Sequence, residues 1–368
     1  MPTALLLSMH NLGEWSTKAT NAPTAGGSLP YGLQYLRNHF EITWSDAQRS
    51  GIWQTRLSRA IGGAVRRGAP GLQGSLGAFY AIPHLRTADV ALSVFENVGL
   101  GFARSQRLSE PVHCSVPHVM LTCWLAEDCR HMSPSGLRSV RRSIGAISRV
   151  AVFSANQVSI LQELLGISPE RIGVVTFGVD TDYYNSANMS DPIGGGGLVA
   201  VGGDTRRDYA TLLEAVRIAK VPLTLVCYPR NIVGLDLPSH IKILSGISHD
   251  EYRALVLSAD LVVTPTVGPA YPSGQSVVLE AMSMGRATLT TDSPAIRDYV
   301  THGVNGVLVP PRDAATMADL IDALLANADR TQSLGAAAAK TVRERFSLEH
   351  LWQGVSELMS AACQGHRS

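Results

Sequence analysis

The hydrophobic residues of this chain gather in short apolar runs that alternate with stretches of helical spacing. In the second half, apolar runs predict strands at 198–201, 223–227, 241–244, 261–264, 287–291 and 306–309. Helical spacing predicts helices at 209–220, 250–258, 275–284, 296–300 and 314–326. Alternation of this kind is typical of a parallel sheet with helices on both faces, so we expect an α/β domain of Rossmann-like type.

The first half has the same kind of pattern with more irregular connections. It predicts strands at 3–9, 40–44, 91–96, 116–125, 150–154 and 172–176, and helices at 29–38, 52–67, 134–147 and 157–165, the last ended by Gly166. Residues 11–27 form a long polar loop and residues 125–131 a loop that leaves a strand, and long loops often carry function. We therefore expect a second α/β domain.

A change of composition marks the predicted boundary between the two. Residues 185–197 combine Ser, Asn, Asp and Pro with four consecutive glycines, as linkers do. The 368 residues are also long enough for two domains of ordinary size. We expect an N-terminal domain over residues 1–185 and a C-terminal domain over residues 186–345.

The segment 271–292 is the strongest candidate for a ligand site. Pro272, Ser273 and Gly274 break regular structure, and the predicted helix from Gln275 leaves its first N–H groups free to receive a phosphate. Glu280 lies about one and a half turns further along. At that position its carboxylate can accept hydrogen bonds from two hydroxyl groups of a sugar or ribose.

Each of these residues also has a purely structural alternative. Glu280 could be a solvated carboxylate, but its neighbours are apolar on nearly all sides of the helix, and an acid in a buried element is usually paired or bound to a ligand. For Ser273 and Ser276, capping of the helix competes with direct contact to a ligand. We keep all three as donor-site candidates.

A second phosphate-binding candidate follows the strand at 198–201. Gly202 and Gly203 permit close approach of the backbone, and the guanidinium forks of Arg206 and Arg207 suit a pyrophosphate. Solvated arginines ahead of a helix are the alternative. Ligands bind parallel sheets at the carboxyl ends of the strands, so we add residues from the neighbouring loops to the candidates. The donor-binding set is Gly202, Gly203, Tyr228, Ile247, Ser273, Gly274, Gln275, Ser276 and Glu280.

The first domain offers fewer candidates. His10 ends the first strand, where it is either catalytic or an ordinary surface or core histidine. Gly26 and Gly27 end the long polar loop, and Asp128 lies in the loop at 125–131. We assign these last three residues to the acceptor side.

We expect neither a metal site nor a cofactor. Residues 113–131 contain histidines, cysteines and acids, but the cysteine spacings do not resemble paired zinc knuckles. The one Asp-x-Asp run, Asp180 and Asp182, belongs to the loop before the linker rather than to the phosphate loops. The five cysteines are interpreted as reduced thiols.

Composition excludes several classes of protein. With 45% hydrophobic and 17% charged residues the chain is globular, and a net charge of +1 argues against nucleic acid as a partner. The apolar start at residues 4–9 is too short for a signal peptide or a membrane span, so we expect a cytoplasmic protein. Peripheral membrane contact is an alternative to solvated helix faces for the arginines Arg66, Arg67, Arg138, Arg141 and Arg142.

Several segments together resemble the family-4-like retaining glycosyltransferases of the GT-B fold, which has two facing Rossmann-like domains with a cleft between them. The resemblance lies in the residues that begin with Glu280-Ala-Met-Ser-Met-Gly-Arg, in 290–298, in 302–313 and in 170–184. It implies transfer of a hexose-type sugar from a nucleoside diphosphate sugar to an acceptor hydroxyl, with retention of anomeric configuration and without metal. The acceptor would be a sugar, a lipid-linked molecule or a small molecule.

The resemblance also implies roles for individual residues. Glu280 would hold the donor ribose, Arg206 and Arg207 would stabilise the departing diphosphate, and the backbone from Ser273 to Ser276 would hold phosphate and sugar. His10 is the catalytic candidate of the first domain. The helix at 348–361, within residues 346–368, would cross back and complete that domain.

This sequence departs from the family pattern in three places. The usual Pro-Asn-Gly-Val-Asp is Thr176-Phe-Gly-Val-Asp180, and the Arg…Lys phosphate pair is reduced to the adjacent Arg206 and Arg207.

The third departure concerns the donor sugar. Many members have a glutamate eight positions before the one matched by Glu280, and this chain has Pro272 there. Pro272 keeps a non-catalytic nucleotide-sugar-binding protein as an alternative. A nucleotide-sugar epimerase is a second alternative, because it could share the two-domain architecture. An NAD-dependent oxidoreductase is disfavoured, because no strand is followed by a full Gly-x-Gly-x-x-Gly with an acid after the next strand.

Overall fold

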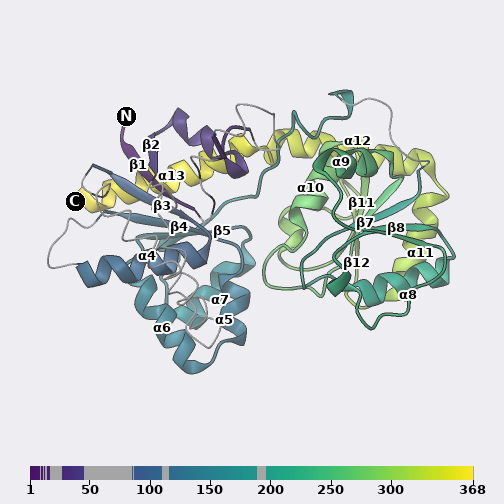
Figure 1. The fold of residues 1–368 in the computed structure, drawn as a ribbon, viewed down its shortest axis with the longest axis horizontal. Helices are drawn as coiled ribbons and strands as arrows, with labels where there is room; N and C mark the ends of the chain where they lie inside the picture. Colours follow the sequence, from purple (N-terminus) through teal and green to yellow (C-terminus); the bar gives the residue numbers. More distant parts are fainter. Residues whose placement is uncertain are drawn as a thin grey trace, which may run out of the picture. The chain divides into compact units, whose positions relative to one another are not determined.

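The computed structural model describes residues 1–8, 27–44, 87–109, 116–188 and 196–367, together with residues 10, 12, 15, 16 and 85. The chain divides into an N-terminal unit, Met1–Val175 with Leu351–Ser368, and a C-terminal unit, Thr176–His350. Figure 1 shows that each unit is built around its own sheet, with helices on the sheet faces. The predicted boundary follows residue 185, whereas the observed one follows residue 175.

The N-terminal unit contains a sheet of six parallel strands in the order β2-β1-β3-β4-β5-β6. Its strands β3 and β4 are buried over their whole length, as expected of a sheet covered on both faces. The chain runs from β1 to β2 on one side and returns to β3 on the other, so the direction of winding changes beside β1. The strands are β1 (Thr3–Leu7), β2 (Glu41–Trp44), β3 (Val90–Val94), β4 (His118–Thr122), β5 (Arg149–Val152) and β6 (Ile172–Val174).

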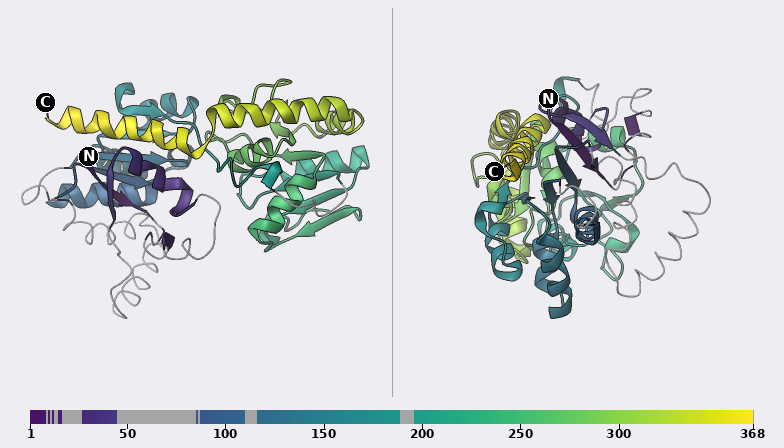
Figure 2. Two further views of the ribbon diagram at one scale, coloured as in Figure 1. Left: turned by 90° about the horizontal axis from the view of Figure 1, so that it is seen from above. Right: turned by 90° about the vertical axis from the view of Figure 1, so that its left-hand side faces the viewer.

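The last helix of the chain packs on this unit. In Figure 2, α13 (Leu348–Arg367) runs beside the first strands. Its buried Trp352 donates from Nε1 to the carbonyl oxygen of Tyr31 at 2.7 Å. The other helices of the unit are η1 (Pro30–Asn38), α4 (Glu96–Ser109), α5 (Leu125–His131), α6 (Pro134–Ile144), α7 (Asn156–Leu165) and η2 (Pro169–Arg171).

The C-terminal unit contains a second sheet of six parallel strands, in the order β12-β11-β10-β7-β8-β9. The predicted and observed bounds coincide for β7, β9, β10 and β11. Each is a short segment rich in apolar or β-branched residues between turns. The strands are β7 (Leu198–Val201), β8 (Leu223–Val226), β9 (Ile241–Leu244), β10 (Leu261–Thr264), β11 (Ala287–Thr291) and β12 (Val307–Val309).

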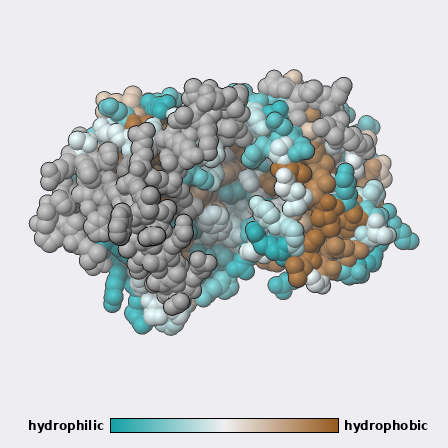
Figure 3. All heavy atoms as spheres, in the orientation of Figure 1, coloured by the Kyte–Doolittle hydropathy of each residue, from teal (hydrophilic) through white to brown (hydrophobic). Residues whose placement is uncertain are grey.

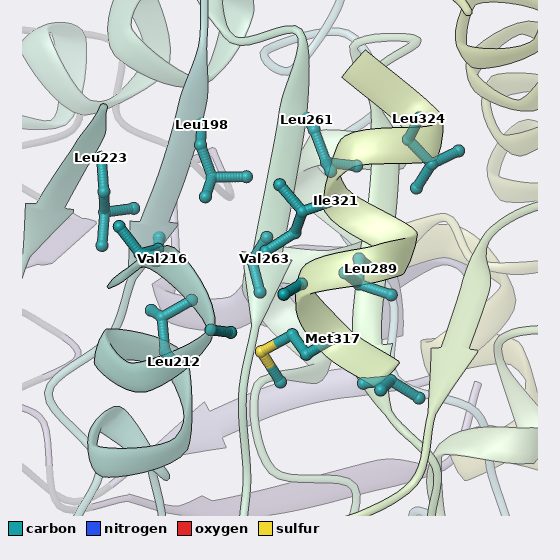
Figure 4. Packing of buried hydrophobic residues seen from close by; sticks show 14 of the residues in the cluster. Leu198, Leu212, Val216, Leu223, Leu261, Val263, Leu289, Met317, Ile321 and Leu324 are labelled. Atoms are coloured by element: carbon teal, nitrogen blue, oxygen red, sulfur yellow. The ribbon is translucent and has the colours of Figure 1, made fainter. Parts of the chain in front are cut away.

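The main core of this unit lies between the sheet and two helices, α8 (Tyr209–Ala219) and α11 (Ala314–Leu325). Figure 4 shows Leu212 and Val216 of α8, and Met317 and Ile321 of α11, turned toward leucine and valine side chains of the strands. The remaining helices are η3 (Ser186–Asn188), η4 (Pro229–Asn231), α9 (His249–Ser258), α10 (Gln275–Ser283), η5 (Ile296–Asp298) and α12 (Ala328–Arg345).

The structure corrects several predicted elements. The helix expected at 29–38 is a 3₁₀ helix in which Tyr31 and Gly32 adopt left-handed backbone angles. The loop expected at 125–131 is the helix α5, a segment too short for its spacing to show a period. The helix expected at 296–300 is the short 3₁₀ helix η5. Helices α4 and α12 were not predicted, and the helix predicted at 52–67 lies outside the described residues.

None of the described helices is long and apolar enough to cross a membrane. Arg138, Arg141 and Arg142 of α6 are exposed, and Arg141 also donates to the carbonyl oxygen of Leu164 at 2.9 Å. Figure 3 shows hydrophobic residues at the surface of the C-terminal unit, where exposed large apolar side chains include Ile218 and Val233. Peripheral membrane contact stays a prediction.

Candidate functional site

The loops after β7 and β10 meet at the carboxyl edge of the C-terminal sheet. Strand β7 pairs with β8 on one side and with β10 on the other, so the direction of winding changes between β7 and β10. Arg207 and Thr266 form an antiparallel bridge, and the Val267 N–H donates to the Arg206 carbonyl oxygen at 3.0 Å. In α/β sheets, ligands bind at this kind of position.

Asp204 ties the two loops together through its side chain. Its Oδ2 accepts the hydroxyls of Tyr271 and Ser273, each at 2.7 Å, and its Oδ1 accepts the backbone N–H of Arg206 at 3.0 Å. Burial raises the pKa of Asp204, but these hydrogen bonds and the charge of Arg207 outweigh burial and leave the pKa below its ordinary value. Asp204 is therefore ionised, and its hydrogen bonds hold the two loops together.

The guanidinium of Arg207 lies between two glycines of these loops. A Cβ atom added to Gly202 would meet its Nε at 2.1 Å, and one added to Gly274 would meet its Nη1 at 2.1 Å. Burial lowers the pKa of Arg207, but an arginine stays protonated in proteins. Because Gly202 and Gly274 have no side chains, the Arg207 guanidinium fits between the two loops at the edge of the sheet.

Several buried polar atoms around Gly274 have no hydrogen-bond partner among the residues that the structure describes. They are Nε and Nη1 of Arg207, Oγ1 of Thr264 and Oε1 of Gln275. Thr264 also contacts the position that a Cβ of Gly274 would occupy, at 2.4 Å. Buried polar groups are normally paired, so such a cluster indicates a place where a ligand supplies the partners.

Helix α10 begins at this cluster. Gly274 is its N-cap, with a φ of 82° and no side-chain cap, so the structural alternative considered for Ser273 and Ser276, capping of the helix, does not apply. Ser273 instead donates to Asp204. Within the described residues, no hydrogen bond engages the N–H groups of Ser276 and Val277. These two donors and the helix dipole favour an anion.

Glu280 is half-buried on α10, which is otherwise almost entirely buried. The hydroxyl of Tyr252 on α9 donates to its Oε2, and Tyr184 also hydrogen-bonds to the carboxyl group. Burial raises the pKa of Glu280 to about 7, and the two hydroxyls oppose that rise. The structure thus brings Glu280 together with two tyrosines at one edge of the sheet.

The other donor-side candidates differ in the contacts that they make. The Gly202 carbonyl oxygen accepts the Tyr209 hydroxyl at 2.6 Å, and a Cβ on Gly203 would meet the Tyr228 ring at 2.3 Å. Tyr228 is half exposed and lies under the guanidinium of Arg230 at 4.3 Å.

The remaining donor-side candidate, Ile247, and the catalytic candidate Arg206 make weaker cases. Ile247 is half-buried in the loop before α9 and is not part of the contacts described above for the other donor-side candidates. Arg206 holds the loops together through its backbone, whereas the guanidinium that enters the edge is that of Arg207.

The N-terminal candidates occupy the edge of the other sheet. His10 follows β1, and its Nε2 lies 3.3 Å from the Tyr31 hydroxyl. Gly27 has a φ of 81° and packs against Gln34. Asp128 is exposed in the first turn of α5 rather than in a loop, and Gly26 lies outside the described residues.

Sequence reasoning missed the residues that hold the site together. It assigned no role to Tyr252, Tyr184, Asp204 or Tyr271. Asp204 gave a usable signal, because it is a carboxylate directly after two glycines at a strand end. The tyrosines gave none, since each meets its partner only through the packing of separate elements.

The described residues contain no group of three or more His, Cys, Asp or Glu side chains that could hold a metal. His113 and Cys114, from the segment first considered for metal, lie outside them. Among the residues that the structure describes, Cys123, Cys129, Cys227 and Cys363 form no disulfide bond.

The comparison with family models identifies part of the chain. Residues 198–327 match the model described as glycosyl transferases group 1. A D-inositol 3-phosphate glycosyltransferase of Nocardia farcinica is 33% identical over 251 residues, which are 60% of this chain and 54% of that protein. A phosphatidyl-myo-inositol mannosyltransferase of Mycobacterium leprae is 34% identical over 110 residues, 29% and 28% of the two chains. The chain thus spans about half, or less, of the length of these relatives.

Solved structures resemble the whole chain. Anabaena Alr3699/HepE in complex with UDP-glucose aligns with a TM-score of 0.66 and 17% identity, covering 98% of this chain and 100% of that one. Sucrose-phosphate synthase of Thermosynechococcus elongatus aligns with a TM-score of 0.66 and 16% identity over 100% of both chains. Residues 198–327 therefore match the model of glycosyl transferases group 1, and the two parallel-sheet units have the GT-B fold.

Proposed function

We propose that this protein transfers a hexose-type sugar from a nucleoside diphosphate sugar to an acceptor hydroxyl, with retention of anomeric configuration. One observation carries the proposal more than any other. The buried guanidinium of Arg207 has two unpartnered nitrogens beside the open N-terminus of α10. A diphosphate would supply acceptors to both groups of donors at once.

The ribose of the donor would bind at Glu280. A carboxylate accepts hydrogen bonds from two vicinal hydroxyls. In this structure the hydroxyls of Tyr252 and Tyr184 already donate to Glu280. Ribose would therefore exchange with one or both of them. The exchange replaces hydroxyl donors with hydroxyl donors, so the half-buried carboxylate is not left without partners.

Retention in this proposal needs no nucleophile from the protein. The bond between the anomeric carbon and the diphosphate oxygen breaks, and the acceptor oxygen forms a new bond to the anomeric carbon on the same face. The departing phosphate accepts the proton of the acceptor hydroxyl. Arg207 and the N-terminus of α10 would stabilise the charge that develops on the phosphate, and Arg206 would add to their field. Metal independence is part of the same proposal.

UDP-glucose is the first donor to test. The Anabaena protein was solved with UDP-glucose, and two relatives are named as a mannosyltransferase and an inositol phosphate glycosyltransferase. We propose, by that likeness, a hexose donor and a sugar, cyclitol or lipid-linked acceptor.

The test compares Arg207→Ala with Arg217→Ala. Arg217 is an exposed arginine of α8 that pairs with Glu214 and Asp236, away from the sheet edge, and is the matched control. Calorimetry should give a UDP-glucose Kd about 10- to 100-fold weaker in Arg207→Ala, the effect of losing hydrogen bonds to a charged group. Arg217→Ala should bind like the wild-type protein.

Equal UDP-glucose affinity in wild type and Arg207→Ala would remove the donor site. Product analysis separates the alternative activities. Transfer requires an acceptor, an epimerase converts UDP-glucose without one, and a binding protein leaves the donor intact.

A further inference from the structure

A cluster of tyrosines lies beside the acid of α10. Tyr183 and Tyr184 are neighbours in a turn, and Tyr252 belongs to α9. Ring centroids are 5.0 Å apart from Tyr183 to Tyr184 and 6.5 Å apart from Tyr184 to Tyr252, and both pairs meet edge to face. The hydroxyls of Tyr184 and Tyr252 donate to Glu280. That of Tyr183 donates instead to Asp250, at 3.0 Å.

Helix α9 fixes the backbone of Tyr252 independently of Glu280. The Tyr252 N–H donates to the Ser248 carbonyl oxygen at 2.9 Å. Ser248 and Glu251 form a capping box in the same turn. The Ser248 hydroxyl oxygen accepts the Glu251 N–H at 3.2 Å, and the Glu251 carboxylate accepts the Ser248 N–H at 2.7 Å. Such a box satisfies two N–H groups that the start of a helix otherwise leaves free, so this turn is closed before any ligand binds.

The turn that carries Tyr183 is held on the same helix. Arg253 donates from Nη1 to the Tyr183 carbonyl oxygen at 2.9 Å, and its guanidinium lies 4.2 Å from the centroid of the Tyr183 ring. The Tyr183 hydroxyl in turn donates to Asp250. Asp250 and Arg253 lie on either side of Tyr252 in the sequence of α9. These contacts hold the turn beside Tyr252 without involving Glu280.

The electrostatics of this contact keep the proton on the tyrosine. Burial, and then the charge of Glu280, raise the pKa of Tyr252 well above its ordinary value, whereas the smaller effect of Arg207 lowers it. Tyr252 therefore stays a hydrogen-bond donor at neutral pH. On the acid, burial raises the pKa of Glu280, and the hydrogen bonds from Tyr252 and then Tyr184 lower it. Of the two tyrosines, Tyr252 thus does more to favour the ionised carboxylate.

We propose that Tyr252 is a positioning residue of the donor site. Its hydroxyl stays bonded to Oε2 of Glu280 when the donor binds and holds the carboxylate as an ionised acceptor, while ribose exchanges with the Tyr184 hydroxyl alone. A carboxylate has about four acceptor positions on its two oxygens, so Tyr252 and two ribose hydroxyls can bind to it together. The inference rests on the proposed function, because it names the residue that prepares Glu280 for the ribose of that donor.

The test compares Tyr252→Phe with the matched control Tyr183→Phe. Each variant loses one phenolic hydroxyl of the same cluster, but that of Tyr183 is bonded to Asp250. Calorimetry with the full chain gives the UDP-glucose Kd at pH 6.5 and pH 8.5. At pH 6.5, Tyr252→Phe should bind about 2- to 10-fold more weakly than the wild-type protein, because Glu280 without this hydrogen bond ionises at a higher pH. At pH 8.5 the carboxylate is largely ionised in both proteins, so the difference should shrink to less than about twofold.

A titration without donor checks the contact directly. The side-chain carboxyl ¹³C signal of Glu280, assigned by its loss in Glu280→Gln, reports the pH at which this group ionises. Its midpoint should lie at higher pH in Tyr252→Phe than in the wild-type protein. Tyr183→Phe should match the wild-type protein in this midpoint and in both Kd values.

The two measurements keep this inference apart from the proposed function. A Kd difference that is largest at pH 6.5, together with a raised Glu280 midpoint, supports the role of Tyr252. Equal Kd values in Tyr252→Phe and wild type at both pH values, a loss of the same size at both, or tighter binding overturns it. In those cases, binding that Glu280→Gln weakens leaves the donor site in place and removes only the role of Tyr252. A wild-type protein that does not bind UDP-glucose overturns both proposals.

Discussion

At the scale of single residues, the chemistry of a side chain here depends on which groups the fold brings to it. Glu280 is an ordinary acid in the sequence, yet burial raises its pKa to about 7 while Tyr252 and Tyr184 donate to it. Asp204 has the opposite outcome, because three hydrogen bonds keep its pKa low despite burial. Two carboxylates of the same sheet edge thus have different protonation behaviour at neutral pH.

Donor binding should depend on pH through Glu280. Ribose hydroxyls donate to the ionised carboxylate, so binding favours the charged form and should tighten as pH rises through about 7. Part of the side chain meets solvent, so we expect an increase of a few-fold, below the limit of about tenfold per pH unit.

Calorimetry with UDP-glucose at pH 6 and pH 8 tests this prediction. Neither donor phosphate titrates in this range, because each carries one ester and one anhydride bond and keeps a single strongly acidic oxygen. The variant Glu280→Gln cannot ionise and should bind weakly, with no pH dependence from this group. A wild-type affinity that falls as pH rises would contradict the assigned role of Glu280.

At the scale of elements, the start of α10 is the part of the molecule on which the donor site depends. The loops after β7 and β10 meet there. Gly274 has a left-handed φ of 82°, and the Arg207 guanidinium packs against the position that a Cβ atom of Gly274 would occupy. Any side chain at this position would displace Arg207 or Thr264. The glycine is therefore required for two independent reasons, backbone conformation and space.

The variant Gly274→Ala separates these two reasons when compared with Gly234→Ala. Gly234 has a φ of 79° and no atom near its Cβ position, so alanine there should cost about 1–2 kcal/mol from the backbone alone. Gly274→Ala should cost about 2–4 kcal/mol, because overpacking adds to that cost.

Urea unfolding curves measure both values, and UDP-glucose binding should be lost only in Gly274→Ala. Equal destabilisation in the two variants, with binding retained, would mean that the space at Gly274 has no role in the donor site.

Elements also show which parts of the fold the sequence could predict. Strands such as β7 and β10 were predicted because residues buried on both faces form unbroken apolar runs. Helix α5 was taken for a loop, since seven residues rich in polar side chains give no period. Helix η1 was taken for an α-helix because local spacing does not reveal that Tyr31 must adopt a left-handed conformation.

At the scale of the whole molecule, the last residues of the chain belong to the same unit as the first. Trp352 is 1% exposed, and Val355 and Met359 on the same helix are fully buried. These side chains form part of the N-terminal core. The stability of that unit should therefore depend on a segment from the far end of the sequence.

The variant Trp352→Ala should destabilise the N-terminal unit by about 3–5 kcal/mol, the usual cost of a large cavity. Hydrogen exchange read by mass spectrometry should show faster exchange in β1 and β3, with β7 and β10 unchanged. Gln353→Ala, at an exposed neighbour, is the control. Equal loss of protection in both sheets would contradict the division into two units.

The sequence by itself determined the alternation of strands and helices, the parallel character of the C-terminal sheet, and the breaks at Gly202 and Gly274, because burial and backbone freedom leave local patterns. The tertiary structure alone decided which side chains meet. Asp204 meets Tyr271 across 67 residues, and Tyr252 meets Glu280 across 28. Such contacts depend on β7 lying beside β10 and on helices packing over that edge, and no local pattern records the spatial order of strands.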